Sequence, residues 1–273
     1  MGKLSLILVI FLCFYQKVSS QTCFKNTDYY PNSFGTGYSR YSLTSADFNG
    51  DSIIDLAVTN YTGSVTILTG IGLGAFNETA TYSVSSVPWS ITTEDFNNDG
   101  KPDLATTATN KIGILLNNGS VVFSTPVYIT CNCDSRSLIS SDFNGDGNLD
   151  IAFANYSSHN VGVLMGTGTG SFNAAVYYPT GWNAFGVVAS DFNSDGKIDL
   201  AVSNYGANNV SILLGSSTGT FSPAVNYAIG NAPRLINCND FNLDGKMDLA
   251  IVNNSSNNVS VLMGNGLGAF STA

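Results

Sequence analysis

One short pattern gathers most of the oxygen-bearing side chains that could bind a cation. Five times, at intervals of 47 to 49 residues, the chain has Asp-Phe-Asn-x-Asp-x-x-x-Asp, beginning at Asp47, Asp95, Asp142, Asp191 and Asp240. Side-chain oxygens therefore fall at loop positions 1, 3, 5 and 9. Calcium takes six to eight oxygen ligands, and alternate residues of a tight loop supply them together with a backbone carbonyl at position 7. The spacing predicts one calcium site per copy.

Turn formation is the simpler alternative, because Asp and Asn favour turns without any metal. Five copies in one register favour a cation, since three carboxylates within nine residues repel one another when no cation lies among them. Magnesium suits such ligand-rich loops less well than calcium. Position 6 is Gly in four copies, where a positive φ is expected, and Ser52 in the first copy departs from the pattern. The predicted ligands of up to five calcium ions are Asp47, Asn49, Asp51, Asp55, Asp95, Asn97, Asp99, Asp103, Asp142, Asn144, Asp146, Asp150, Asp191, Asn193, Asp195, Asp199, Asp240, Asn242, Asp244 and Asp248.

Short strands must position these loops. In the fourth copy we expect strands at residues 185–190, 200–203, 210–214 and 221–227, with a turn at residues 205–208, because runs of four to eight apolar or alternating residues are bounded by Gly, Asn and Ser. No segment has sustained helical periodicity. Four strands per repeat of nearly 50 residues match a β-propeller blade. The fold class is therefore all-β, a propeller of four-stranded antiparallel blades.

These motifs resemble the FG-GAP, or VCBS-type, repeat. The resemblance rests on Asp-Phe-Asn-x-Asp-Gly-x-x-Asp-Leu-Ala and on the Gly-rich stretch from Val161 to Phe172, and it covers residues 21–273. It implies a propeller similar to that of integrin α-chain heads, with calcium in the hairpin loop between the first two strands of each blade. The second repeat departs from the pattern, because residues 117–120 replace the longer Gly-rich turn.

Closure of the ring has two possible forms. Residues 24–30 resemble the strand at 221–227, and the chain stops at Phe270 where the fifth repeat needs that strand. We therefore expect the N-terminal strand to complete the last of five blades, which would remove an exposed sheet edge. The alternative is a fragment of a ring with six or seven blades.

The first 20 residues have the features of a secretory signal peptide. Lys3 precedes an apolar run, and small residues lie before Gln21. No stretch reaches the roughly 20 apolar residues that a membrane-spanning helix needs, so we expect a secreted protein without a transmembrane segment of its own. The net charge is -9, and all but four of the 19 acidic residues are loop aspartates; the four are Asp28, Glu78, Glu94 and Asp134. The acidity therefore belongs to the loops, and without a basic patch nucleic acid is not an expected partner.

Cysteines and sequons fit a secretory route. The mature chain has Cys23, Cys131, Cys133 and Cys238, which allow either two disulfides or one local bridge with two free thiols. Glycosylation is expected at a few of the Asn-x-Ser/Thr sites, which begin at Asn60, Asn77, Asn118, Asn155, Asn209, Asn253, Asn254 and Asn258.

Candidate ligand-binding residues lie where the repeats differ. Six residues before each loop the chain has Tyr41, Trp89, Arg136, Phe185 or Arg234. In a propeller these positions ring one face, opposite the metal loops, and the turns between second and third strands open on the same face. Aromatic residues and Arg are enriched at binding hot spots, although Trp89 and Phe185 could instead fill the central channel. The predicted ligand-binding residues are Trp89, Arg136, Trp182, Arg234, Tyr61, Tyr156 and Tyr205.

Three functions remain open. The favoured one is an adhesion or recognition module for an extracellular protein, because the variable positions differ from blade to blade. The alternative is lectin-like binding of a glycan ligand on aromatic platforms. A calcium-assisted polysaccharide-degrading enzyme is less favoured: His159 is the only histidine, and the four remaining acids lie in different repeats. We therefore expect no enzymatic activity.

Overall fold

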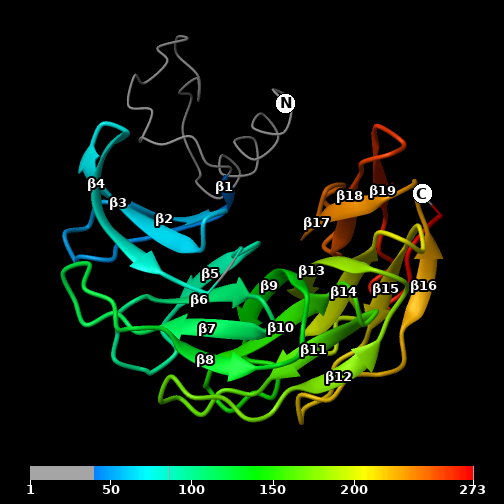
Figure 1. Cartoon of the computed structure of the whole chain (residues 1–273). Coiled ribbons are helices and arrows are strands. Elements are labelled where there is room, and N and C mark those ends of the chain that lie inside the picture. The colour runs from blue at the N-terminus through cyan, green and yellow to red at the C-terminus, as the bar shows by residue number, and fades with distance from the viewer. Residues whose placement is uncertain (1–39, 86, 273) are drawn as a thin grey trace. The chain divides into compact units, whose positions relative to one another are not determined.

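The computed structural model describes residues 40–85 and 87–272, and all its regular elements are β-strands (Figure 1). The strands form five antiparallel sheets in chain order. No helix of the described residues is long and apolar enough to cross a membrane. The expectations for the signal peptide, Cys23 and the strand at residues 24–30 lie outside the described residues.

Each sheet corresponds to one repeat. The first sheet has β1 (Arg40–Ala46), β2 (Asp55–Asn60), β3 (Ser64–Gly72) and β4 (Ala75–Ser83). The second has β5 (Ile91–Glu94), β6 (Asp103–Ala108), β7 (Lys111–Leu115) and β8 (Val127–Thr130). The third has β9 (Ser135–Ser141), β10 (Asp150–Asn155), β11 (Asn160–Leu164) and β12 (Val176–Pro179). The fourth has β13 (Ala184–Ser190), β14 (Asp199–Asn204), β15 (Asn209–Leu213) and β16 (Val225–Ala228). The fifth has β17 (Pro233–Asn239), β18 (Asp248–Asn253) and β19 (Asn258–Leu262).

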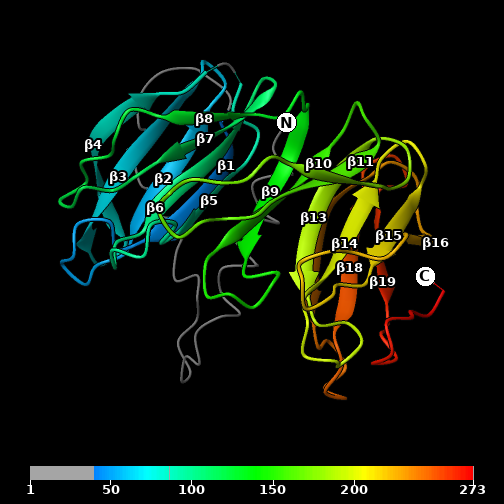
Figure 2. The same ribbon diagram turned by 90° about the horizontal axis from the view of Figure 1, so that it is seen from below.

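The sheets pack as the blades of a β-propeller. Their first strands lie next to one another in the order β1, β5, β9, β13, β17 (Figures 1 and 2). The second strand of each blade, and usually the third, is buried on both faces: β10 and β14 are buried throughout. Apolar side chains therefore form four clusters, one between each pair of neighbouring sheets. The all-β blade architecture is thus confirmed.

Interlocking phenylalanines join neighbouring blades. The Phe at loop position 2 packs edge to face on a Phe of the next blade, as in Phe48 on Phe123 and Phe192 on Phe270. Four of these loop phenylalanines are 1–3% exposed. Phe241 of the fifth loop, in contrast, is 42% exposed. Among the described residues no following blade covers it, as β17 and β1 do not pack as the other first strands do.

Two local expectations need correction. The fourth strand of the fourth blade begins at Val225 and not at Phe221, because Phe221 forms an isolated bridge with Gly215 and turns its ring into the core. The turn in the second repeat is not shorter: Asn117 bridges Phe123 over the same number of residues as Gly166 and Phe172. The fifth sheet shows three strands among the described residues, and which segment would pair with β19 remains a prediction.

The covalent features are partly settled. Cys131 and Cys133 form a local disulfide, whereas the Cys238 thiol is free. Two of the eight sequon asparagines, Asn155 and Asn253, are 1–2% exposed. Their side chains have no room for a glycan in the folded protein, so glycosylation is expected only at the others.

Candidate functional site

The five acidic loops all join the first strand of a blade to the second. In the third loop the Asp142 carboxylate accepts backbone N–H groups from Gly145 at 2.7 Å and Gly147 at 2.8 Å. Asp146 accepts the N–H of Asn148 at 2.8 Å. Position 6 has a positive φ in every loop, as expected, including Ser52 at 67°. Glycine adopts this conformation without strain, so Ser52 makes the first loop the most strained at this position.

The aspartate at position 9 has a structural role that the sequence analysis missed. Asp199 is fully buried, and its two oxygens accept the backbone N–H groups of Phe192 at 2.9 Å and Gly215 at 2.7 Å. One bond holds the loop and the other holds the end of the third strand. The same pair of bonds is made by Asp55, Asp103, Asp150 and Asp248. Whether these carboxylates also bind calcium stays a prediction.

Lysine divides the loops into two kinds. In the second, fourth and fifth loops the residue at position 7 is Lys, and its ammonium group lies 2.9–3.4 Å from the carboxylate at position 5, in the pairs Lys101–Asp99, Lys197–Asp195 and Lys246–Asp244. Lysine hydrogen bonds lower the pKa of Asp99 and Asp195. In the first and third loops the carboxylate at position 5 accepts a hydrogen bond from the Asn side chain at position 3 instead. In the third loop, Asn144 Nδ2 donates to Asp146 at 3.0 Å.

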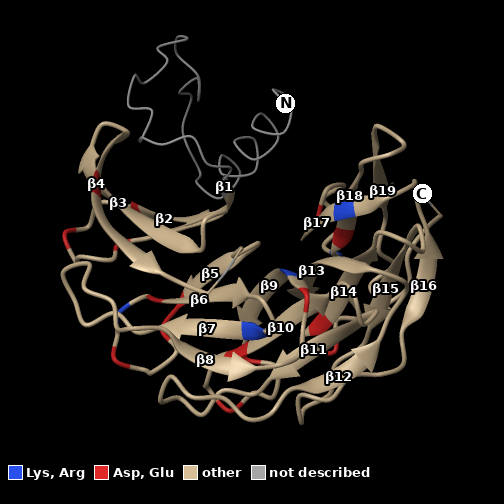
Figure 3. Ribbon diagram, viewed as in Figure 1, with Lys and Arg blue, Asp and Glu red and all other residues tan. Residues whose placement is uncertain are grey.

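Figure 3 marks the Asp and Glu residues in red along the ribbon, where several lie in loops between strands. Among residues 40–85 and 87–272, no three Asp, Glu, His or Cys side chains are arranged so that together they could hold a metal ion. In a calcium site, the position 3 amide and the position 7 carbonyl would add neutral oxygens to the carboxylates at positions 1 and 5. This oxygen-only set has the chemistry that calcium prefers, with water completing the shell.

Removing metal should make stability depend on pH. Burial raises the pKa of Asp103 from 3.8 to about 6, and it raises the pKa of Asp150 and Asp199 as well. The folded state then binds more protons than the unfolded state between these values, so stability falls as pH rises through this range. We expect thermal melts in chelator to move down by several degrees between about pH 4 and about pH 6.5. Asp103→Asn, which cannot titrate, should flatten this slope; a melting temperature that rises over this range would contradict the prediction.

At the opposite end of the blades, a β-bulge presents the variable residue in four of the five blades, whereas Trp89 lies just before β5 (Ile91–Glu94). In β13 the register skips Phe185, because Ala184 pairs with Asn204 and Gly186 with Ser203. Register shifts at the same place leave out Tyr41, Arg136 and Arg234. A bulge leaves its extra residue unpaired and redirects its side chain.

Buried hydroxyl groups in the second strands fix these positions. Thr107 Oγ1 accepts the backbone N–H of Trp89 at 2.8 Å, and Ser203 Oγ accepts that of Gly186 at 3.0 Å. Thr59 does the same for the N–H of Ser42. The bulged residues are therefore held by their own blades before any ligand arrives.

Together with Trp89 and the tyrosines of the turns after the second strands, the redirected side chains form one continuous row, which we call the aromatic–arginine belt. Its members are Tyr61, Tyr41, Trp89, Arg136, Tyr156, Phe185, Tyr205 and Arg234. Successive members lie 4.2–6.1 Å apart, measured between ring centres or from a guanidinium carbon to a ring centre. The belt runs from the first blade to the fifth. It contains six of the seven predicted ligand-binding residues, and it adds Tyr41 and Phe185.

Trp182, the seventh predicted residue, lies beside the belt. Its indole is 69% exposed and stacks on His159 with 5.8 Å between ring centres. Its backbone carbonyl accepts the N–H groups of Gly206 and Ala207, from the turn that carries Tyr205. Trp182 therefore offers a large open ring surface next to the belt.

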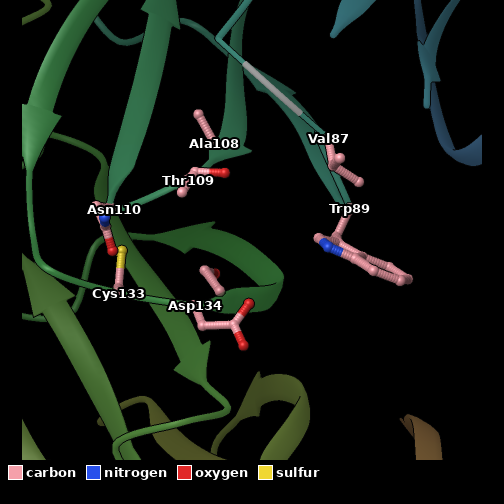
Figure 4. Close-up of a pocket in the computed structure, with 8 residues that line it drawn as sticks. Val87, Trp89, Ala108, Thr109, Asn110, Cys133 and Asp134 are labelled. Carbon is pink, nitrogen blue, oxygen red and sulfur yellow. The ribbon is translucent and has the colours of Figure 1, made fainter. Parts of the chain in front are cut away.

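A small pocket lies under the belt at Trp89 (Figure 4). It has a volume of about 100 Å³, and its lining includes Trp89, Asn110, Asp134 and Cys133 of the disulfide. The Asp134 carboxylate pairs with Arg136 at 2.9 Å and accepts the Ser157 hydroxyl at 2.8 Å. In the sequence, Asp134 stood out only as one of the four acids outside the acidic loops, and no partner was predicted for it.

Trp89 itself has little free ring surface. The Tyr41 ring centre lies 4.3 Å from the indole, and the Arg136 guanidinium lies 4.2 Å from it. These two neighbours leave little room for a sugar ring to stack on that indole. The packing of the belt rings on one another agrees with the channel-filling interpretation. The continuous surface that they form agrees with the binding interpretation.

Comparison with known proteins supports the repeat architecture. The FG-GAP-like repeat family matches residues 47–106, 95–153 and 142–202. The comparison with curated protein sequences finds no match. Solved structures with a similar fold include an Agrocybe aegerita lectin described as recognising non-reducing terminal N-acetylglucosamine, at 17% identity and a TM-score of 0.56, over 86% of this chain and 65% of the lectin.

Two further structures are similar at comparable levels. A functionally unknown protein from Desulfotomaculum acetoxidans has 18% identity and a TM-score of 0.60, over 87% of this chain and 70% of its own. The V. cholerae biofilm matrix protein Bap1 has 17% identity and a TM-score of 0.53, over 85% of this chain and 39% of its own. This chain thus spans less than two thirds of the lectin and of Bap1, and at these identities the likeness concerns the fold. The family match and the repeated blades together show that the chain belongs to the FG-GAP-like repeat family.

Proposed function

We propose that the protein is a secreted recognition module, stabilised by calcium, whose aromatic–arginine belt binds an extracellular protein partner. The belt itself carries this proposal. Its rings and guanidinium groups are of the types enriched at binding hot spots, and they are arranged in one row across five blades. Trp182 adds exposed apolar surface at its side.

A protein ligand suits the belt because its side chains differ from blade to blade. A repeated sugar would be met by repeated pockets, whereas the residue six positions before each loop is Tyr41, Trp89, Arg136, Phe185 and Arg234 in turn. The positions of the acids outside the loops also favour a binding function over a catalytic one. Of those the structure describes, Glu78 lies in β4, Glu94 ends β5 and Asp134 precedes β9, so they do not form the close pair that acid–base catalysis uses.

Glycan binding is the second candidate, and the Trp89 pocket favours it. A carboxylate and an amide beside an aromatic ring are groups that hold sugar hydroxyls. The lectin of similar fold is described as recognising N-acetylglucosamine. Trp182 is the better platform for stacking in such a role, since its ring is largely exposed whereas that of Trp89 is covered.

Photocrosslinking tests the protein-binding proposal. A photoreactive phenylalanine analogue at position 182, beside the belt, is expected to crosslink to a protein in extracellular medium that contacts cells secreting this chain. The same analogue at Leu243, which is 88% exposed in the fifth acidic loop, is the control and should not crosslink to that protein. Crosslinks from position 243 alone would place the binding face at the acidic loops and would contradict the proposal. Calcium-dependent binding on a glycan array, without any protein crosslink, would favour the lectin instead.

A further inference from the structure

We propose that Arg234 is the anchor for a carboxylate of the ligand, supplied by an Asp or Glu side chain in an acidic segment of the partner protein. This inference rests on the proposed function and names the chemistry that the belt selects. It goes beyond a general apolar surface, because it assigns one charged contact at one end of the belt.

The Arg234 guanidinium has rings around it but no anion. It lies 5.4 Å from the centre of the Phe185 ring and 5.5 Å from that of Tyr205. Among the described residues, it makes no ion pair and no side-chain hydrogen bond, and its buried Nε has no acceptor. A partly buried cation with unused donors is costly unless a partner satisfies them. A ligand carboxylate could accept two parallel hydrogen bonds from the terminal Nη groups of the guanidinium.

The third blade shows what a satisfied arginine looks like in the same position. Arg136 also lies six residues before a loop, and its Nη2 donates to Asp134 at 2.9 Å. Its Nε likewise lacks an acceptor, but its charge is balanced. Asp134 comes two residues before Arg136, whereas Ala232 comes two residues before Arg234. The chain thus neutralises one belt arginine itself and leaves the other for a partner.

The backbone at Arg234 is held firmly in place. Its backbone carbonyl accepts the buried Ser203 hydroxyl at 2.6 Å. A Cβ added at Gly186 would approach that carbonyl oxygen closely, so glycine allows β17 to lie tightly against β13. Asn208 Oδ1 accepts the N–H of Ala232 at 2.9 Å. The backbone at Arg234 is thus ordered before a ligand binds, which lowers the cost of ordering this segment on binding.

The surroundings favour a peptide over an acidic sugar. An acidic sugar brings several hydroxyl groups that need polar partners, whereas the contacts of the Arg234 guanidinium are the faces of Phe185 and Tyr205. An Asp or Glu flanked by apolar side chains matches an arginine between aromatic rings. We therefore expect an acidic residue with apolar neighbours in the partner.

The test is a titration followed by NMR, with the calcium-loaded protein and two peptides that differ in one charge. The probes are N-acetyl-Phe-Asp-Phe-amide and its Asn counterpart. The Asp peptide is expected to shift the Arg234 Nε–H signal saturably, and the Asn peptide should bind about tenfold more weakly. Arg234→Gln should bind both peptides with the same weak affinity. Lys111→Gln removes one cation that lies over Tyr128, outside the belt, and should behave as the unmodified protein does.

Arg234→Lys keeps the positive charge but loses the planar guanidinium that donates two parallel hydrogen bonds. It should therefore prefer the Asp peptide more than Arg234→Gln does, but less than the unmodified protein does. Equal binding of the two peptides, or an Arg234→Gln variant of unchanged melting temperature that still prefers the Asp peptide, would overturn the assignment. A shift with glucuronate and none with the Asp peptide would overturn the peptide ligand. If position 182 still crosslinks to a protein while the peptides are not discriminated, the proposed function stands and only the role of Arg234 fails.

Discussion

Asp199→Ala is expected to lower the free energy of unfolding by about 3 kcal/mol in the absence of calcium. The carboxylate is fully buried and accepts the N–H groups of Phe192 and Gly215. Alanine would leave both donors buried without an acceptor, and each such loss costs about 1–3 kcal/mol. The loop and the third strand of the blade would lose their shared attachment. Urea denaturation in excess chelator measures the change.

Asp195→Ala is the matched control, because it removes a carboxylate from the same loop at the surface. Its losses are one backbone bond from Lys197 and the exposed pair with the Lys197 ammonium, and exposed ion pairs contribute about 0–1 kcal/mol. In chelator, Asp195→Ala should therefore cost much less than Asp199→Ala. Asp199→Asn keeps one acceptor oxygen, so its loss in the free energy of unfolding should lie between those of Asp195→Ala and Asp199→Ala. Equal losses for Asp195→Ala and Asp199→Ala in chelator would show that position 9 has no separate structural role.

The repeat pattern predicts the loops and the strand order because both are local. A turn such as residues 205–208, or a positive φ at position 6, depends on residues within a few positions. The fourth strand was misplaced at Phe221 because an aromatic residue before an apolar run looks like strand, while its ring instead fills the space beside Phe143 of the preceding blade. That contact joins two repeats and has no local signal.

The belt illustrates the same limit at the candidate site. Its residues were found by asking where the repeats differ, which identifies the position but not the contacts. The bulges that redirect Phe185 and Arg234 depend on pairing with β14 and β18, and the brace at Arg234 comes from Ser203 of the neighbouring blade. The ion pair of Asp134 with Arg136 joins residues two positions apart, so their proximity is local, whereas the rings around both arginines come from neighbouring strands and turns.

Chelation of calcium is expected to produce the largest change in stability. A ligand that binds only the folded state stabilises it by about 2.7 kcal/mol at a concentration of 100 times its dissociation constant, as for millimolar calcium at a site of about 10 µM. Several such sites together would exceed the usual net stability of a domain. Excess chelator should therefore lower the melting temperature by more than about 10 °C, and calcium should restore it while an equal concentration of magnesium should not.

A single loop variant then separates metal binding from the structural bonds of the loop. With calcium present, Asp195→Ala should cost one site's share, about 2.7 kcal/mol, and native mass spectrometry should show one calcium ion fewer. In chelator the same variant should differ little from the unmodified protein, because the site is then empty in both. Asp199→Ala should be destabilised in both conditions. A melt that does not move in excess chelator would refute the stabilising role of calcium, and it would leave the acidic loops as turns held by their own backbone hydrogen bonds.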